Sequence, residues 1–305
     1  MKISICLCTY NAEKYINKLL PSILSQTLTP DIILINDDCS SDSTIKILDS
    51  YASSYPKIKW IIKRNKENLG WRKNYQNAIS HCPGDLIFLC DQDDIWNKEK
   101  IYDMAHSFNF ATMDVLCSGY KVSYDNSKAE KVHNKRFFSG KIKQIKSPHL
   151  LADNYPGCCL CFSSKIIPLF ISSLNENAPH DWILWNLAFL RKRLYMLDKP
   201  EILFIRHFSS ASNSGIKPCS KEKFEIKFNE LKYKIDFLSH LISLEDKDHV
   251  STIERKYLLW LKNRYDFYSQ KKLSSLIKVL LHPFFFTSFR SLICEILGLF
   301  VIKKK

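Results

Sequence analysis

Residues 84–96 read GDLIFLCDQDDIW, and this stretch decides the fold class. The apolar run Leu86–Cys90 is typical of a fully buried strand. It stops at three aspartates in four positions, Asp91, Asp93 and Asp94. Carboxylates packed this closely repel one another, and burying any of them is costly without a partner. A strand that ends in this way indicates a bound cation or ligand at the strand end.

The segments before this stretch alternate between strands and helices. Apolar runs predict strands at residues 3–8, 31–36, 59–62 and 85–90, and helical spacing predicts helices between them. Asn11 is expected to cap the first of these helices. The alternation predicts βαβ units with a parallel sheet, in which ligands bind at the carboxyl ends of the strands. Polar residues follow three of the predicted strands, namely Thr9, then Asp37 and Asp38, then the three aspartates above.

An Asp-x-Asp arrangement at a strand end suits Mg²⁺ or Mn²⁺, which prefer oxygen ligands. Such an ion is the largest local charge and removes the repulsion between the carboxylates. The alternative is a solvated acidic turn that caps a helix around residues 97–105. The chain has only 7 glycines and contains neither GxxxxGK[ST] nor GxGxxG, which argues against P-loop NTPases and Rossmann oxidoreductases.

The charge is distributed unevenly along the chain. The formal net charge is +14, and residues 251–305 contribute 11 Lys/Arg against 3 Asp/Glu, a difference of +8. A basic, apolar segment of this kind fits a peripheral anionic membrane surface, with a helix pair packed on the domain as the alternative. Its apolar runs are shorter than the roughly 18 residues of a spanning helix. The N-terminus lacks a signal-peptide pattern and the 11 cysteines lie mostly in apolar runs, so we expect a cytoplasmic protein with buried free thiols, Cys158 and Cys161 included.

The N-terminal half resembles the family 2 glycosyltransferases of the GT-A fold. The resemblance rests on ISICLCTYNAEKYI, SILSQT, ILINDDCSSDST, NLGWRKNYQNAI and GDLIFLCDQDDIWNKEKI, which occur in the family's order over about residues 2–101. The DQDDIW form is similar to bacterial rhamnosyltransferase-like members that build surface polysaccharides. The resemblance weakens after residue 105 and continues at GCCLCF, His180-Asp181-Trp182 and Arg206-His207.

The resemblance implies roles for the residues at the donor site. Thr9 and Tyr10 would hold the nucleoside, and Asp38, beside Asp37, would accept the N3–H of uracil or thymine. Arg72 would contact phosphate or base, and Asp91 would face the ribose. Asp93 would bind the metal, whereas Asp94 has no assigned role. The family has DDGS or DDNS where this chain has Cys39, so a residue without glycine's conformational freedom occupies the turn.

The later motifs imply the catalytic residues of an inverting sugar transfer, which needs a general base and a stabilised leaving group. Asp181 matches the family's base, with His180 in place of the usual Glu. Asp181 could instead cap a helix over residues 183–189. His207 would join the metal site, and Gly157 and Trp182 would shape the acceptor side.

We therefore expect an α/β, GT-A domain over residues 1–220, with a mixed, mainly parallel sheet flanked by helices. Residues 221–305 are expected to form a helical, basic region. The expected reaction moves a sugar from a UDP- or dTDP-sugar, such as dTDP-rhamnose, to a lipid-linked or growing glycan at the inner face of the membrane. The alternatives are a sugar-phosphate nucleotidyltransferase, or a non-catalytic basic protein that binds membrane or nucleic acid. We expect no nucleic-acid partner.

Overall fold

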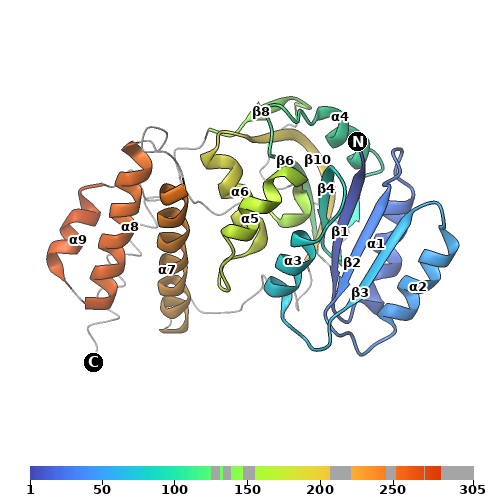
Figure 1. Ribbon diagram of the computed structural model, residues 1–305, viewed down its shortest axis with the longest axis horizontal. Helices are drawn as coiled ribbons and strands as arrows, with labels where there is room; N and C mark the ends of the chain where they lie inside the picture. The colour runs from blue at the N-terminus through green and yellow to red at the C-terminus, as the bar shows by residue number, and fades with distance from the viewer. Residues whose placement is uncertain are drawn as a thin grey trace. The chain divides into compact units, whose positions relative to one another are not determined.

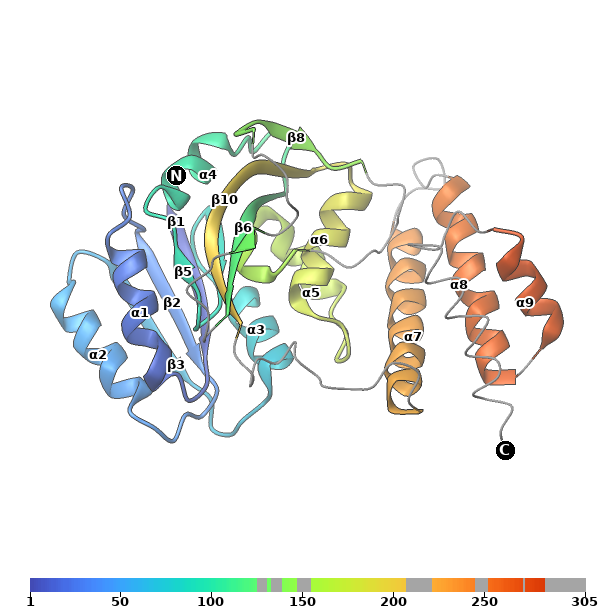
Figure 2. The ribbon, with the colours of Figure 1, turned by 180° about the vertical axis from the view of Figure 1, so that it is seen from behind.

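The protein is described by a computed structural model that covers residues 1–124, 131–132, 139–146, 155–206, 221–244, 252–270 and 272–282. The chain forms two compact units, one with the described residues up to Arg206 and one with those from Lys221 onward. In the first unit a mixed sheet lies between two layers of helices (Figures 1 and 2). The GT-A architecture expected from the sequence, a mixed sheet flanked by helices, is confirmed.

The sheet has the strand order β3-β2-β1-β4-β9-β6-β10-β5, with β7 beside β6 and β8 beside β10. Strands β1 to β4 are parallel to one another, as the alternating pattern predicts, and β9 joins β4 antiparallel. The strands are β1 (Ile3–Thr9), β2 (Ile32–Asp37), β3 (Lys59–Arg64), β4 (Leu86–Cys90), β5 (Ile95–Trp96), β6 (Val115–Tyr124), β7 (Lys131–Val132), β8 (Ile142–Gln144), β9 (Leu160–Ser163) and β10 (Leu194–Arg206).

Helices cover both faces of this sheet. Helices α1 and α2 lie on one face, and α3, α5 and α6 contact one another on the other (Figure 2). The helices of this unit are α1 (Glu13–Leu24), α2 (Thr44–Ser54), α3 (Trp71–Ser80), α4 (Lys100–Ser107), α5 (Ile167–Ser172) and α6 (His180–Leu190). Helix α1 shows why they form, because its apolar residues recur at helical spacing and are fully buried: Ile16, Leu19, Leu20 and Ile23.

The register of the parallel strands brings their polar ends to one edge. Thr9 at the end of β1 pairs with Asp37 at the end of β2. On the other side of β1, Leu7 pairs with Cys90, the last residue of β4. The residues that follow β1, β2 and β4 therefore lie at the same carboxyl edge.

Strand β9 brings a later part of the chain to this edge. The apolar run at residues 158–162 predicts a strand over its whole length, but Gly157–Cys159 form a 3-10 turn and the strand begins at Leu160. Because β9 runs antiparallel to β4, with Phe88 opposite Cys161, this turn lies beside the end of β4. The difference of two residues places Gly157 and Cys158 next to the aspartates rather than inside the sheet.

The N-terminus of α1 is capped from another loop, so the expected capping by Asn11 is wrong. Asn11 has a left-handed backbone, φ 47°, and its side-chain oxygen accepts the backbone N–H of Ser41. The N–H of Ala12 is accepted instead by Thr44 Oγ1 at 2.8 Å, and Asp42 accepts the N–H of Glu13. The loop between β2 and α2 therefore completes the first helix.

The second unit consists, in its described part, of α7 (Lys221–Leu244), α8 (Thr252–Gln270) and α9 (Leu273–Leu280). Phe228 of α7 stacks on Tyr265 of α8, and the Trp260 indole of α8 donates to the carbonyl of Val279 on α9. Among the described residues, no helix has the length and apolar character that a membrane crossing requires.

Candidate active site

Asp37 organises the end of β2 from inside the protein. Its carboxylate is fully buried and accepts hydrogen bonds from Thr9 Oγ1, from Ser40 Oγ and from the Ser40 backbone N–H. Arg64 lies 3.8 Å from the second carboxylate oxygen. Thr9 and Asp37, both expected to contact the nucleoside, thus bind each other and fix the turn that carries Asp38.

Asp38 is a hydrogen-bond acceptor at the carboxyl edge. It is buried, and its carboxylate accepts the backbone N–H groups of Leu69 and Gly70 at 2.8 and 2.9 Å, and the side-chain amide of Asn65. Asn74 in turn accepts a hydrogen bond from the Asn65 amide. A carboxylate has about four lone-pair sites, so three internal donors leave room for one more. The start of α3 therefore aligns Asp38 for a single external donor.

Residues Asp91–Asp94 form a tight turn after β4, called the carboxylate turn below. Gln92 ties this turn to β1, because it accepts the backbone N–H of Tyr10 at 2.8 Å and donates to the Tyr10 carbonyl. Asp91 accepts the Tyr75 hydroxyl from α3 at 2.6 Å, and the same hydroxyl lies 2.8 Å from the Cys90 carbonyl. The ring of Tyr10 is 46% exposed at the edge.

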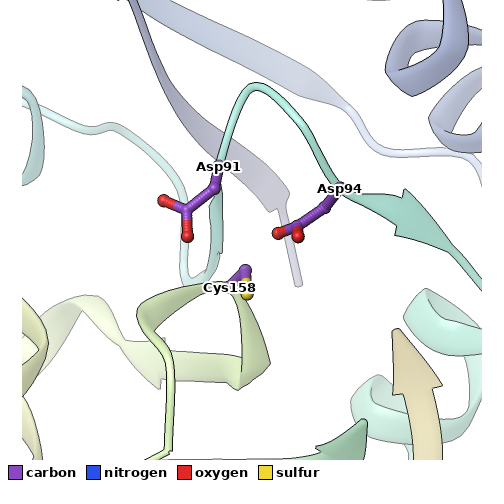
Figure 3. Close-up of side chains that lie close together, drawn as sticks. All are labelled: Asp91, Asp94 and Cys158. Carbon is purple, nitrogen blue, oxygen red and sulfur yellow. The ribbon is translucent and has the colours of Figure 1, made fainter. Parts of the chain in front are cut away.

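Two aspartates of the carboxylate turn face the 3-10 turn that precedes β9. Figure 3 shows the side chains of Asp91, Asp94 and Cys158 close together. One ligand atom from each of the three residues lies within 4.8 Å of the other two. Asp94 is 1% exposed, and neither of its oxygens makes a hydrogen bond with the described residues. Burial, together with the charges of Asp91 and Asp93, raises the pKa of Asp94 well above its ordinary value. The carboxylates of this turn are a donor set that fits a hard divalent cation.

Asp181 lies in the first turn of α6, close to Gly157. A Cβ on Gly157 would lie 3.3 Å from the Asp181 Cβ and 3.0 Å from His180 Nε2, so the glycine permits a close approach of the two segments. Burial raises the pKa of the Asp181 carboxyl above its ordinary value, and the N–H groups of Trp182 and Gly157 oppose that rise. A carboxylate with a raised pKa is a stronger base than an ordinary aspartate.

His180 connects Asp181 to the carboxylate turn. Its buried imidazole stacks on Tyr75 with ring centroids 3.9 Å apart, and Tyr75 holds Asp91. Burial lowers the pKa of His180 to about 4, against the opposing charge of Asp91, so the ring is neutral at physiological pH. The substitution of a neutral ring for the family's usual Glu therefore adds no charge beside Asp181.

The remaining predicted site residues are placed less directly. Arg72 lies exposed at the start of α3 with its guanidinium 4.4 Å from the Trp71 ring centroid, at the same helix end as Asp38's backbone donors. Trp182, a residue of α6, is 5% exposed, so its indole is buried in the protein interior. Asp93 is part of the carboxylate turn but not of the three-residue group with Cys158. His207 lies outside the described residues.

The structure adds residues that the sequence interpretation did not single out for the site: Asn65, Asn74, Tyr75, Gln92 and Lys100. All lie in the motifs NLGWRKNYQNAI and DQDDIWNKEKI or just before the former. Asn74 and Lys100 are 2% and 0% exposed. The sequence signal that could have identified these two residues is a polar or charged side chain on the buried face of a predicted helix.

Comparison with known proteins agrees with this geometry. The family model of glycosyl transferase family 2 matches residues 4–170, more than half of the chain. A dTDP-rhamnosyl transferase, RfbG of Shigella flexneri, is 28% identical over 228 residues, which cover 71% of this chain and 77% of that protein. A poly(ribitol-phosphate) β-N-acetylglucosaminyltransferase, TarS of Staphylococcus aureus, is 34% identical over 119 residues, covering 38% of this chain and 20% of that protein.

Solved structures show the same fold at lower identity. The S. aureus TarS 1–349 complex with UDP-GlcNAc superposes with a TM-score of 0.63 at 20% identity, covering 92% of this chain and 79% of that one. A mannosyltransferase of Pyrobaculum calidifontis, in complex with GDP-Man and Mn²⁺, gives 0.54 at 11% identity, covering 99% and 85%. The chain belongs to glycosyl transferase family 2 and is a glycosyltransferase.

Proposed function

We propose that the enzyme transfers a sugar from a UDP- or dTDP-linked donor, with dTDP-rhamnose as the first candidate, to a hydroxyl of a lipid-linked or growing cell-surface glycan. The observation that carries the proposal is a continuous set of contacts at one sheet edge. It runs from Asp38 through the asparagines to α3, then from Tyr75 to Asp91 and to His180, the neighbour of Asp181. These contacts support our assignment of base recognition, diphosphate binding and proton acceptance to one site.

The pyrimidine preference follows from Asp38. Its carboxylate is an acceptor only, and uracil and thymine offer an N3–H where cytosine has none. The backbone N–H groups of Leu69 and Gly70 hold the carboxylate in one position. The rhamnose preference is supported by the name of the Shigella relative, a dTDP-rhamnosyl transferase.

In the transfer step we assign Asp181 as the general base. It accepts the proton of the acceptor hydroxyl while that oxygen bonds to the anomeric carbon. The bond from the anomeric carbon to the donor diphosphate breaks, and its electron pair leaves with the nucleoside diphosphate. Attack opposite the leaving group inverts the anomeric configuration. Tyr75 and Gln92 hold the carboxylate turn in place during this step.

The carboxylate turn fits Mg²⁺ or Mn²⁺, with Asp93 and Asp91 as the ligands we assign and His207 as a further candidate. A bound ion of this kind would neutralise the charge that develops on the diphosphate. EDTA is therefore expected to abolish transfer, with activity restored by Mn²⁺.

A donor panel tests the proposal. Release of nucleoside diphosphate should be measured with UDP- and dTDP-sugars in Mn²⁺, with a matched CMP-sugar as the control that lacks the N3–H. We expect turnover with a thymidine or uridine donor and none with the cytidine donor. Preferential use of the cytidine donor would refute the role of Asp38, and turnover of no donor in the panel would refute the transfer assignment.

We further propose that the second unit binds an anionic membrane surface at the inner face of the cell membrane. Helix α9 exposes Ile277 and, just after its end, Leu281, at 53% and 69%, with Lys278 between them. Exposed apolar residues beside lysine favour an interfacial position. Sedimentation with vesicles containing an anionic lipid should retain the wild type and release the double variant Ile277→Ser/Leu281→Ser. Equal retention of both proteins would refute this surface.

A further inference from the structure

Trp71 is an exposed tryptophan at the carboxyl edge of the sheet. All six tryptophans lie in the part of the chain that the structure describes, and Trp71, at 41%, is the only exposed one. It is the first residue of α3 and directly follows Gly70, whose N–H binds Asp38. Ligands of parallel sheets bind at this edge. Neither the donor contacts nor the metal ligands assigned above include this indole.

The Trp71 ring contacts α6 at the residue before the general base. Its centroid lies 6.2 Å from that of the His180 ring at an interplanar angle of 76°, an edge-to-face contact. Tyr75, one helical turn later on the same face of α3, stacks on His180 as well, at 3.9 Å. Because His180 precedes Asp181, the rings of Trp71, Tyr75 and His180 form an aromatic wall beside the base.

This aromatic wall is apolar where it meets solvent. The Arg72 guanidinium lies over one face of the Trp71 ring, 4.4 Å from its centroid. Both nitrogens of His180 are buried and make no hydrogen bond with the described residues, so His180 adds ring surface rather than a polar contact. The Tyr75 hydroxyl is directed to Asp91. The part of the wall that a ligand meets is therefore the flat surface of the indole.

A second exposed ring at this edge distinguishes between the ligands of the site. Tyr10 follows β1, and its backbone is bound to Gln92 of the carboxylate turn, at the end of the site where we assign the nucleoside. Trp71 instead contacts the neighbour of Asp181, which we assign to accept the proton of the acceptor hydroxyl. A pyranose ring has a face of C–H groups that packs on an aromatic ring while its hydroxyls remain at the rim.

We propose that Trp71 is an acceptor-binding residue, whose exposed indole packs against a pyranose ring and presents a hydroxyl of that ring to Asp181. The acceptor is then a pyranosyl terminus of a glycan rather than a linear polyol chain. The role of this sugar as acceptor rests on the proposed transfer reaction. The contact between a pyranose and Trp71 can be measured by binding alone.

Tryptophan fluorescence tests the contact without turnover. The full chain, with Mn²⁺ and UDP or dTDP present, is titrated with methyl α-L-rhamnopyranoside and with the methyl pyranosides of glucose, galactose and N-acetylglucosamine. We expect a saturable change in emission with at least one of them and none with ribitol, a linear polyol. The change should be absent in Trp71→Ala. Tyr55→Ala removes a 43% exposed ring at the end of α2 that leads into β3, and this control should respond as wild type does.

Three results of this titration would overturn the proposal. They are the absence of any emission change in wild type with every pyranoside, an unaltered change in Trp71→Ala, and an equal response to ribitol. If Trp71→Ala does not fold, Trp71→Leu replaces it, because leucine keeps an apolar side chain against His180 and lacks the flat ring.

Calorimetry separates the acceptor from the donor. In Trp71→Ala the Kd values of UDP or dTDP, and of the corresponding nucleotide sugar, should change less than about twofold, because the donor contacts do not include the indole. A loss of affinity of about tenfold for the nucleoside diphosphate would place the nucleobase on Trp71. A similar loss confined to the nucleotide sugar would place the donor sugar there. Either result would overturn the acceptor role.

Kinetics with the pyranoside that binds best provide the last measurement. Its KM as acceptor should rise about tenfold in Trp71→Ala, and Trp71→Phe should restore most of the loss, since a phenyl ring keeps a flat apolar face. An unchanged acceptor KM in Trp71→Ala would overturn the role. Failure of wild type to use any donor would refute the proposed function and leave the fluorescence titration interpretable.

Discussion

At the scale of single residues, each carboxylate of the site has a different environment. The carboxylate of Asp37 is occupied by internal hydrogen bonds, whereas that of Asp38 accepts three internal hydrogen bonds and has room for a fourth. Asp181 is half-buried, and burial raises its pKa. Identical side chains thus differ in their availability to a substrate because their donors differ.

Asp181→Asn is expected to lower kcat by about 10²–10⁴-fold, because the amide cannot accept the acceptor's proton. Calorimetric binding of the nucleoside diphosphate should remain close to that of wild type, since Asp38 and α3 are untouched. Asp49→Asn, an exposed site on α2, is the control and should leave both quantities unchanged. A variant with more than about a tenth of wild-type kcat would show that the base is another residue.

Gly157→Ala is expected to reduce kcat by about tenfold, because the added methyl group would lie 3.0 Å from His180 Nε2 and 3.3 Å from Asp181 Cβ. The neighbours must move by a few tenths of an ångström, which displaces the base from its position. Steady-state kinetics with the preferred donor measure the effect. Gly140→Ala, where nothing lies within 4 Å of the added atom, is the comparison and should lose stability through its φ of +65° without a change in kcat. Equal kcat in the two variants would contradict the positioning role of Gly157.

At the scale of elements, β10 contains a buried acidic residue, Glu201, that lies outside the active site. Glu201 is 0% exposed, and its Oε1 lies 3.4 Å from Lys199 Nζ. Burial raises the pKa of Glu201 from 4.5 to about 7, opposed by Lys199 and increased by Asp103, which faces it from α4. The folded state therefore binds a proton that the unfolded state releases between these two values.

The pKa of Glu201 is higher in the folded state than in the unfolded state. The contribution of this group to the free energy of unfolding is therefore expected to be greatest below pH 4.5. It should fall as the pH rises through about 7. Glu201→Gln removes this dependence, so its Tm should equal or exceed that of wild type at pH 8 and gain no such advantage at pH 5. Differential scanning fluorimetry across this range measures the difference. A constant Tm offset at all pH values would show that Glu201 does not titrate in the window.

At the scale of the whole molecule, the chain divides into two units between Arg206 and Lys221, a boundary that the composition indicates only approximately. The first unit has its own sheet, its own core and every described candidate site residue, whereas the second is helical in its described part. A fragment of residues 1–220 is therefore expected to unfold cooperatively and to bind UDP or dTDP with an affinity within about threefold of the full chain. The measurement is calorimetry beside circular dichroism, with Asp38→Ala in the fragment as the non-binding control. A fragment without a cooperative transition would refute the domain division at residue 220.

The sequence predicted the parallel strands and the carboxyl edge, because buried runs that end in aspartates follow directly from burial and charge. It did not predict the partners of those aspartates. Lys100 meets Cys158 across 58 positions, and Tyr75 meets Asp91 across 16, and no local periodicity encodes such pairings. The prediction that Asn11 caps α1 is wrong because hydrogen-bond acceptors supplied by a distant part of the chain leave no local sequence pattern. Family resemblance supplied the role of Asp181, which the motif HDW alone leaves open between a base and a helix cap.

The cap that Thr44 and Asp42 give to α1 also has a kinetic consequence. The N–H of Ala12 donates to Thr44 Oγ1, and the N–H of Ser43 donates to the Glu13 carboxylate, so two segments about 30 positions apart satisfy each other's backbone donors. Neither helix start is satisfied until the intervening chain has closed, which costs loop entropy before these contacts stabilise it. The amide protons of Ala12 and Ser43 should therefore exchange with solvent at similar rates in native-state hydrogen exchange, as members of one cooperative opening unit.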